Sequence, residues 1–202
     1  MSALQTWYWV RHAPPINPLG LAYGQMDIDA DFSNIPSLQR VGAILPVGAF
    51  WLASPLKRAF FTAVHTGGTQ SPPLDPKDIR KEPLLIEQSF GQWESVSRQI
   101  LRHDAAFLNY IGDPVNVAPP GGESLSDLFR RVSAHIGVLE NQLQTHDNVI
   151  VVCHGGTIRA ALSHVTGQNI GAFLKTKLPP LAIARTTYDR GLRAWQPTFA
   201  VI

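Results

Sequence analysis

The sequence is poor in cysteine and in long apolar runs. Cys153 is the one cysteine among 202 residues, which excludes an internal disulfide and a zinc site built from thiolates. The longest apolar stretch, 41–53, is too short to span a bilayer and contains Pro46. The N-terminus lacks the charged and apolar regions of a signal peptide. These features predict a cytoplasmic protein without a membrane partner.

Neither sign of charge is in large excess. Seventeen Lys and Arg residues stand against fifteen Asp and Glu residues, a net charge of +2, and no long Lys/Arg run occurs. We therefore expect no nucleic-acid partner. The chain also lacks a P-loop, a G-x-S-x-G motif and a GxGxxG fingerprint. The length fits one domain, which we place at residues 1–202, and nothing in the sequence indicates the oligomeric state.

The apolar pattern predicts an α/β protein. Short buried strands are expected at 7–10 (WYWV), 49–53 (AFWLA) and 148–153 (NVIVVC). Helical patterns follow these strands at 57–65, at 95–111, at 124–145 and in the stretch after His154. The tail, residues 182–202, predicts two strands around D-R-G. Ser124 and Asp127 are typical of a capping box. We expect a three-layer fold with a mostly parallel central sheet flanked by helices.

Charged and imidazole side chains follow three of the expected strands. Arg11 and His12 come after the first strand, Arg58 follows the second in S-P-L-K-R, and His154 follows the later strand in H-G-G. The carboxyl ends of parallel strands converge on one crevice, and the helix after His154 would add its positive N-terminal end. Such a pocket suits a phosphate group. It suits a metal ion poorly, because the arginines would repel the cation.

Four motifs in order resemble the histidine phosphatase superfamily, also called the phosphoglycerate mutase-like family. They are V-R-H-A-P-P, S-P-L-K-R-A-F-F-T-A, E-Q-S-F-G-Q-W-E-S and V-V-C-H-G-G-T-I-R-A-A-L, and the resemblance covers roughly residues 8 to 163. Y-G-Q-M-D at 23–27 is similar to a stretch of the small bacterial phosphatase branch that includes α-ribazole phosphatase. The resemblance implies a phosphoglycerate mutase-like fold.

The resemblance also implies roles for five residues. His12 would be the nucleophile that becomes phosphohistidine, Arg11 and Arg58 would bind the phosphoryl oxygens, and His154 would donate a hydrogen bond to the same group. Glu87 would be the general acid and base. These residue types fit the chemistry, because arginine binds two oxygens with its planar fork and a neutral histidine can attack phosphorus. No metal or other cofactor is expected.

The contacts to the rest of the substrate are less defined by the sequence. Asn17 and Gln25, on the loop after the nucleophile, are candidates for substrate binding. Loops at 13–36, 66–83 and 111–121 are expected to form the rim of the pocket. Glu94, Asp27 and Glu123 are alternatives to Glu87 as the acid.

The sequence favours a metal-independent phosphomonoesterase whose partner is a small-molecule phosphate ester, such as α-ribazole 5'-phosphate or a sugar or carboxylic acid phosphate. A phosphoglycerate mutase-type phosphotransferase is one alternative. A phosphate-binding protein without turnover is another, since Ala13 stands where the family has glycine and Pro14-Pro15 follow it. Alanine at this position requires a backbone conformation that accepts a β-carbon.

Overall fold

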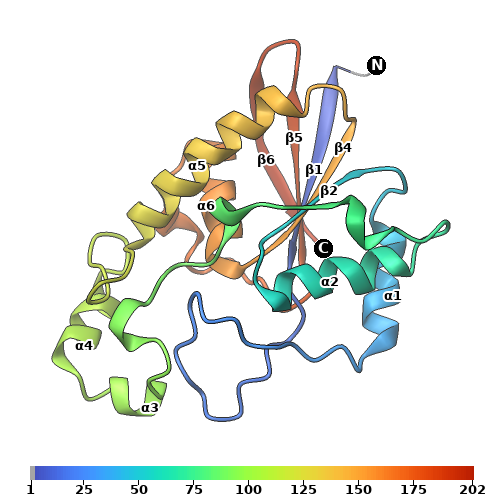
Figure 1. Ribbon diagram of the computed structural model, residues 1–202. Helices are drawn as coiled ribbons and strands as arrows, with labels where there is room; N and C mark the ends of the chain where they lie inside the picture. Colours follow the sequence, from blue (N-terminus) through green and yellow to red (C-terminus); the bar gives the residue numbers. More distant parts are fainter. Residues whose placement is uncertain (1–2) are drawn as a thin grey trace.

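A six-stranded sheet forms the centre of the protein in the computed structural model, which describes residues 3–202 (Figure 1). The strand order is β3-β2-β4-β1-β5-β6. The first four of these strands pair in parallel, whereas β5 and β6 are antiparallel to their neighbours. The strands are β1 (Leu4–Arg11), β2 (Phe50–Ala53), β3 (Ile79–Lys81), β4 (Asn148–Cys153), β5 (Ile183–Asp189) and β6 (Ala194–Val201). The expectation of a mostly parallel α/β sheet is confirmed.

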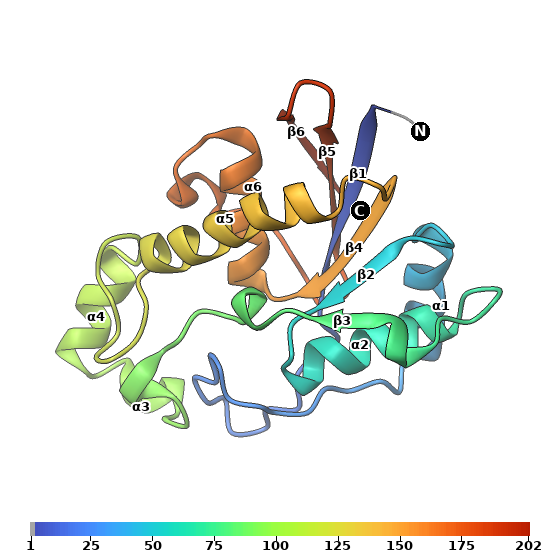
Figure 2. The same cartoon turned by 45° about the horizontal axis from the view of Figure 1, so that its top comes forward.

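Helices cover both faces of the sheet, so the fold has the three layers expected from the sequence (Figures 1 and 2). One face carries α1 (Ile35–Ile44) and α2 (Lys57–Gly68), and the other carries α5 (Leu125–Gln142) and α6 (Gly155–Thr166). Side chains along β1 point alternately to the two faces of the sheet and so contribute to the apolar core on each face. Trp7 and Trp9 pack on the α5 and α6 side, and Val10 packs on the α1 and α2 side.

A smaller group of elements lies beyond the carboxyl end of β1 (Figure 1). It contains α3 (Arg98–Leu101), α4 (Ala105–Gly112) and part of the loop that follows β1. Its own apolar cluster joins Ala22, Trp93, Leu101 and Tyr110. This arrangement places aromatic side chains opposite the strand ends that carry the histidines.

Several element boundaries differ from the sequence expectation. The helix expected at 95–111 is two helices, because Ser97 caps α3 and Asp104 caps α4. Helix α1 was not predicted, although Asn34 caps it and proline occupies its first turn. The region 66–83, expected to be a loop, contains the end of α2 and the three-residue strand β3, which is too short for a period to be recognised. Short 3-10 helices span Pro76–Asp78, Pro83–Leu85, Gly91–Trp93 and Ile170–Phe173.

Other boundaries agree closely with the expectation. Helix α5 begins with the capping box of Ser124 and Asp127, although it ends at Gln142 rather than at residue 145. The tail forms β5 and β6 on either side of D-R-G. Within the described residues 3–202, no helix is both long and apolar enough to pass through a bilayer.

Candidate active site

The two histidines stand side by side at the ends of neighbouring strands. In the parallel register, Arg11 of β1 lies opposite Cys153 of β4, so the next residues, His12 and His154, leave the sheet at the same level. The backbone N–H of His12 donates to the carbonyl of Cys153 at 3.0 Å. The two imidazole centroids are 5.2 Å apart. The sheet itself therefore brings these two predicted site residues together.

His12 has one ring nitrogen free to act as a nucleophile. Its Nδ1 lies 2.7 Å from the carbonyl oxygen of Ala13, and since a carbonyl only accepts hydrogen bonds, Nδ1 carries the proton. In the neutral ring, Nε2 then keeps its lone pair. Burial lowers the pKa of His12 to about 3, against the opposing effect of the Ala13 bond, and Arg58 and Arg11 lower it further. The imidazole is therefore neutral at pH 7.

His154 is oriented by a serine from the neighbouring strand end. Its Nε2 lies 2.8 Å from Oγ of Ser54. That hydroxyl oxygen also accepts the N–H of Leu56 at 3.5 Å; with its second lone pair and its proton it fits either tautomer of the ring. Burial, followed by the nearby Arg58, lowers the pKa of His154 well below its usual value. His154 is therefore neutral, and its Nδ1 is buried without a partner among residues 3–202.

Arg58 and Arg11 are aimed by backbone carbonyls rather than by carboxylates. Arg58, in the first turn of α2, is fully buried and donates to the carbonyls of Met26 at 2.7 Å and Gly24 at 2.6 Å. Arg11 donates to the carbonyl of Leu178. Burial lowers the pKa of Arg58, and the nearby acidic groups, first of all Glu87, oppose this effect. Within residues 3–202, both guanidinium groups are held in place without a direct ion pair.

Three buried nitrogens in this group have no hydrogen-bond partner among residues 3–202. They are Nε of Arg11, Nε of Arg58 and Nδ1 of His154. A buried polar group without a partner costs about 1–3 kcal/mol, and both arginine nitrogens are donors. A phosphoryl group would supply the acceptors that the arginines lack. Among residues 3–202, His, Cys, Asp and Glu side chains form no group of three that could hold a metal ion.

Ala13 fits its position without strain. The positive-φ residues other than glycine within residues 3–202 are Ser95, Leu181 and Arg193, so Ala13 has an ordinary backbone conformation. Its side chain is buried, and its N–H donates to Oγ1 of Thr62 at 2.8 Å. Alanine at this position thus leaves the loop after His12 well anchored.

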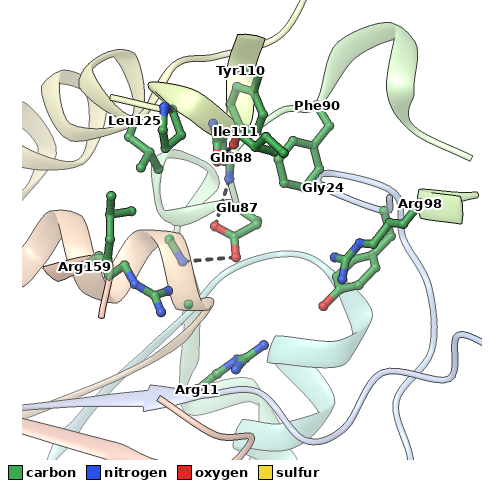
Figure 3. Close-up of a pocket in the computed structure, with 15 residues that line it drawn as sticks. Arg11, Gly24, Glu87, Gln88, Phe90, Arg98, Tyr110, Ile111, Leu125 and Arg159 are labelled. Atoms are coloured by element: carbon green, nitrogen blue, oxygen red, sulfur yellow. Dashed lines mark hydrogen bonds between the residues drawn. The ribbon is translucent and has the colours of Figure 1, made fainter. Parts of the chain in front are cut away.

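A cavity of about 400 Å³ adjoins these residues (Figure 3). Arg11 and Gly155 connect it to the two histidines, which are almost completely buried and do not line it. The cavity therefore lies beside a deeper pair of imidazole rings. It is lined by Arg11, Tyr23, Gly24, Glu87, Gln88, Phe90, Arg98, Tyr110, Ile111, Pro114, Leu125, Gly155, Gly156, Arg159 and Leu174.

Glu87 projects into this cavity from the segment that precedes the small group of helices (Figure 3). Its carboxylate accepts the N–H of Gly156 at 3.2 Å and that of Gln88 at 2.9 Å. Its carbonyl accepts hydrogen bonds from Gln25 at 2.9 Å and Arg131 at 3.2 Å. A β-carbon on Gly156 would collide with the carboxylate, so glycine is required there for Glu87 to reach the helix N-terminus.

The three alternative acids are engaged elsewhere. Glu94 accepts the N–H groups of Gln25 and Phe90 at 2.9 and 3.0 Å. Asp27 accepts the N–H of Lys57 at 2.7 Å, and Glu123 pairs with Arg131 at 2.8 Å. None of the three lines the cavity. Of the four candidate carboxylates, Glu87 is therefore the one that lines the cavity.

Asn17 and Gln25, the residues of the loop after β1 that are expected to contact substrate, form hydrogen bonds within the protein. The amide of Asn17 bonds both the N–H and the carbonyl of Leu21 and closes its own loop, and Gln25 supports the Glu87 backbone. Neither side chain lines the cavity, and the segment 66–83 does not reach it either. The other two loops expected at the rim do line the cavity, 13–36 through Tyr23 and Gly24 and 111–121 through Ile111 and Pro114, and Leu174 adds to them.

Sequence reasoning missed two cationic residues of the cavity, Arg98 and Arg159. Arg159 lies within the quoted H-G-G-T-I-R motif, one helical turn after Gly155. Residues four apart on a helix share a face, and this spacing could have identified it. Arg98 belongs to the misplaced 95–111 helix, and no sequence signal pointed to it.

The two buried histidines should make the protein sensitive to acid. Their folded-state pKa values are lowered, so the unfolded chain binds the extra protons and stability falls as the pH drops below about 6.5 toward the folded pKa. For a folded pKa near 3, one such histidine is expected to cost about 2 kcal/mol between pH 7 and pH 5. Urea unfolding at both pH values measures this loss.

The histidine variants provide the comparison. His12→Gln should lose less stability between pH 7 and pH 5 than the unaltered protein, whereas the exposed His103→Gln should lose the same amount. An identical loss in all three proteins would mean that His12 does not carry this effect.

Comparisons with known proteins agree with the fold and the motifs. Residues 8–197 match the profile of the histidine phosphatase superfamily (branch 1). A protein of Hydrogenobacter thermophilus whose name refers to a phosphoserine phosphatase is 32% identical over 170 residues, 79% of this chain and 78% of its own length. A 2,3-bisphosphoglycerate-dependent phosphoglycerate mutase of Pseudoalteromonas atlantica is 27% identical over 89% of this chain and 94% of its own. The α-ribazole phosphatase structure from Shigella flexneri has a similar fold, with a TM-score of 0.79, 20% identity and coverage of 98% and 95%.

Proposed function

Because the chain belongs to branch 1 of the histidine phosphatase superfamily, we propose that it is a phosphomonoesterase that transfers a phosphoryl group from a small ester to His12 and then to water. Arg11, Arg58 and His154 hold the phosphoryl oxygens, and Glu87 exchanges protons with the leaving group and the water. The cavity draws on residues from Arg11 to Leu174, which supports residues 1–202 acting as one catalytic domain.

One observation carries this proposal: the three unpartnered, buried nitrogens of Arg11, Arg58 and His154. A transferring phosphoryl group spreads negative charge over its equatorial oxygens, so fixed donors around it stabilise the transition state. These donors are held by backbone carbonyls and by Ser54 before any ligand arrives. The free Nε2 of the neutral His12 supplies the nucleophile beside them.

The proposed reaction has two steps, phosphorylation of His12 and hydrolysis of the phosphohistidine. The lone pair on Nε2 of His12 forms a bond to phosphorus while the ester P–O bond breaks, and the departing alkoxide takes a proton from the Glu87 carboxyl group. In the second step, the Glu87 carboxylate takes a proton from water as the water oxygen attacks phosphorus and the P–N bond breaks. The products are an alcohol, inorganic phosphate and the original neutral histidine.

A mutase is the second candidate, since a mutase relative matches 89% of this chain. The same phosphohistidine would then return its phosphoryl group to a second hydroxyl group rather than to water. The stretch between Glu87 and α5 supports hydrolysis, because it is short, with the 3-10 helix Gly91–Trp93 and the helices α3 and α4, and the family's mutases usually carry a longer insertion. Incubation with 3-phosphoglycerate separates the two, since a hydrolase releases phosphate and a mutase forms the 2-phospho isomer.

The proposed activity should not depend on a divalent metal. We expect the rate of p-nitrophenyl phosphate hydrolysis to be the same with and without EDTA. The guanidinium and imidazole groups stabilise the negative charge on the phosphoryl group, as a metal ion would in a metal-dependent enzyme. Vanadate should inhibit, since it adopts the five-coordinate geometry of the transition state. No hydrolysis of any phosphate ester would contradict the proposal. A loss in EDTA that a divalent ion restores would contradict the metal-independent mechanism.

A further inference from the structure

Arg159 is a fixed cation without an acidic partner. It lies in the second turn of α6 and donates through Nε to the carbonyl of Phe173 at 3.0 Å and through Nη2 to that of Thr176 at 3.2 Å. Within the described part of the chain, it forms no ion pair and its Nη1 makes no hydrogen bond. Its guanidinium group lines the cavity (Figure 3). The protein therefore aims one donor of Arg159 at whatever fills the cavity.

Arg159 is held close to a second cation. A β-carbon on Gly155 would lie 3.2 Å from Nη1 of Arg159 and 3.6 Å from Nε of Arg11, so both guanidinium groups lie over the same glycine. Burial lowers the pKa of Arg159, and the charge of Arg11 lowers it further against the opposing effect of Glu87. Two like charges in this geometry repel each other unless an anion lies beside them.

The positive charge that lines the cavity exceeds the negative charge of one phosphoryl group when Glu87 acts as the acid. Arg11, Arg98 and Arg159 line the cavity, against the single carboxylate of Glu87. The net charge of these four residues is +2, or +3 when Glu87 is protonated. A phosphate monoester carries about −1.5 to −2 at pH 7. Positive charge therefore remains after the phosphoryl group is bound.

We propose that the alcohol part of the substrate carries a carboxylate that binds Nη1 of Arg159, a few bonds from the phosphate ester. This inference rests on the proposed phosphatase function. The position of Arg159 beside Arg11 requires a compact substrate, in which the two acidic groups are close together. The apolar wall of Phe90, Ile111 and Leu174 contacts the rest of the molecule. Arg159 is thus a residue that determines specificity.

A matched pair of esters tests this. 3-Phosphoglycerate and glycerol 3-phosphate differ only by a carboxylate in place of a hydroxymethyl group, and single-turnover formation of phosphohistidine can be measured with both. We expect the unaltered protein to prefer 3-phosphoglycerate. Arg159→Gln should lower that preference about 10²-fold, because losing one partner of a hydrogen-bonded charge pair typically has an effect of this order. The loss should appear in KM rather than in kcat, and Arg159→Lys should restore part of it.

Arg98→Gln is the matched control, because Arg98 also lines the cavity but lies across it from Arg159 (Figure 3). It should change the ratio between the two esters by less than about threefold. An equal loss on both esters in Arg159→Gln would assign Arg159 to the phosphoryl group and overturn the inference, as would an unaltered protein without a preference. If p-nitrophenyl phosphate also forms no phosphohistidine, it is the proposed function that has failed.

Discussion

His12→Ala is expected to abolish formation of the phosphoenzyme and to lower turnover by at least about 10⁴-fold, as loss of a nucleophile does in other covalent enzymes. The reason lies in the tautomer, because the bond from Nδ1 to Ala13 leaves Nε2 free to attack. Rapid-quench labelling with a ³²P ester should give an acid-labile, base-stable label on the unaltered protein and none on the variant.

The exposed His103→Ala serves as the control and should retain both label and turnover. His12→Ala should also remain folded, because the His12 side chain forms one hydrogen bond within residues 3–202. A phosphoenzyme on His12→Ala at the normal level would show that another residue is the nucleophile.

Glu87→Gln is expected to lower the phosphorylation rate about 10²–10⁴-fold on an alkyl phosphate, the usual contribution of general acid catalysis. An alkoxide is a strong base and needs a proton as it leaves, whereas p-nitrophenolate leaves without one. The loss on p-nitrophenyl phosphate should therefore be much smaller. Single-turnover rates on glycerol 3-phosphate and p-nitrophenyl phosphate measure the difference. Some loss of steady-state turnover should remain on both, because the same carboxylate activates water.

Glu94→Gln makes the same chemical change seven residues away. The Oε1 atom of Glu94 accepts two backbone N–H groups, and a glutamine oxygen can accept the same bonds. We expect changes of only a few-fold on either ester. A larger and ester-dependent loss in Glu94→Gln than in Glu87→Gln would mean that Glu94 is the acid.

The sequence predicted the centre of the site better than its periphery. Apolar runs such as W-Y-W-V and N-V-I-V-V-C leave few options for a buried parallel sheet, so the residues after them must meet at one edge. Arg11, His12, Arg58 and His154 could be brought together on that basis alone. Glu87 needed the resemblance, because it stands after a turn whose direction a pattern does not specify.

The periphery depends on contacts between segments that are distant in the sequence. Tyr23, Tyr110 and Leu174 meet because α3 and α4 pack over the loop after β1. The polar residue Asn17 was expected to bind substrate, but its amide satisfies its own loop instead. Such local hydrogen bonding competes with ligand binding, and the residue type alone does not show which of the two a side chain adopts.

The pairing of β1 with β4 has a consequence for how this protein can change over time. The imidazoles of His12 and His154 are 5.2 Å apart, close to the spacing of about 4.8 Å between neighbouring strands. The distance between the two rings is thus set by the backbone hydrogen bonds between β1 and β4 and not by loop conformation. Insertions or substitutions in the segments around Tyr23, Tyr110 and Leu174 can reshape the cavity, while the distance between the two histidines stays the same. New substrates are therefore accessible through changes in the rim, whereas a one-residue slip between β1 and β4 would separate the pair and turn one ring to the opposite face of the sheet.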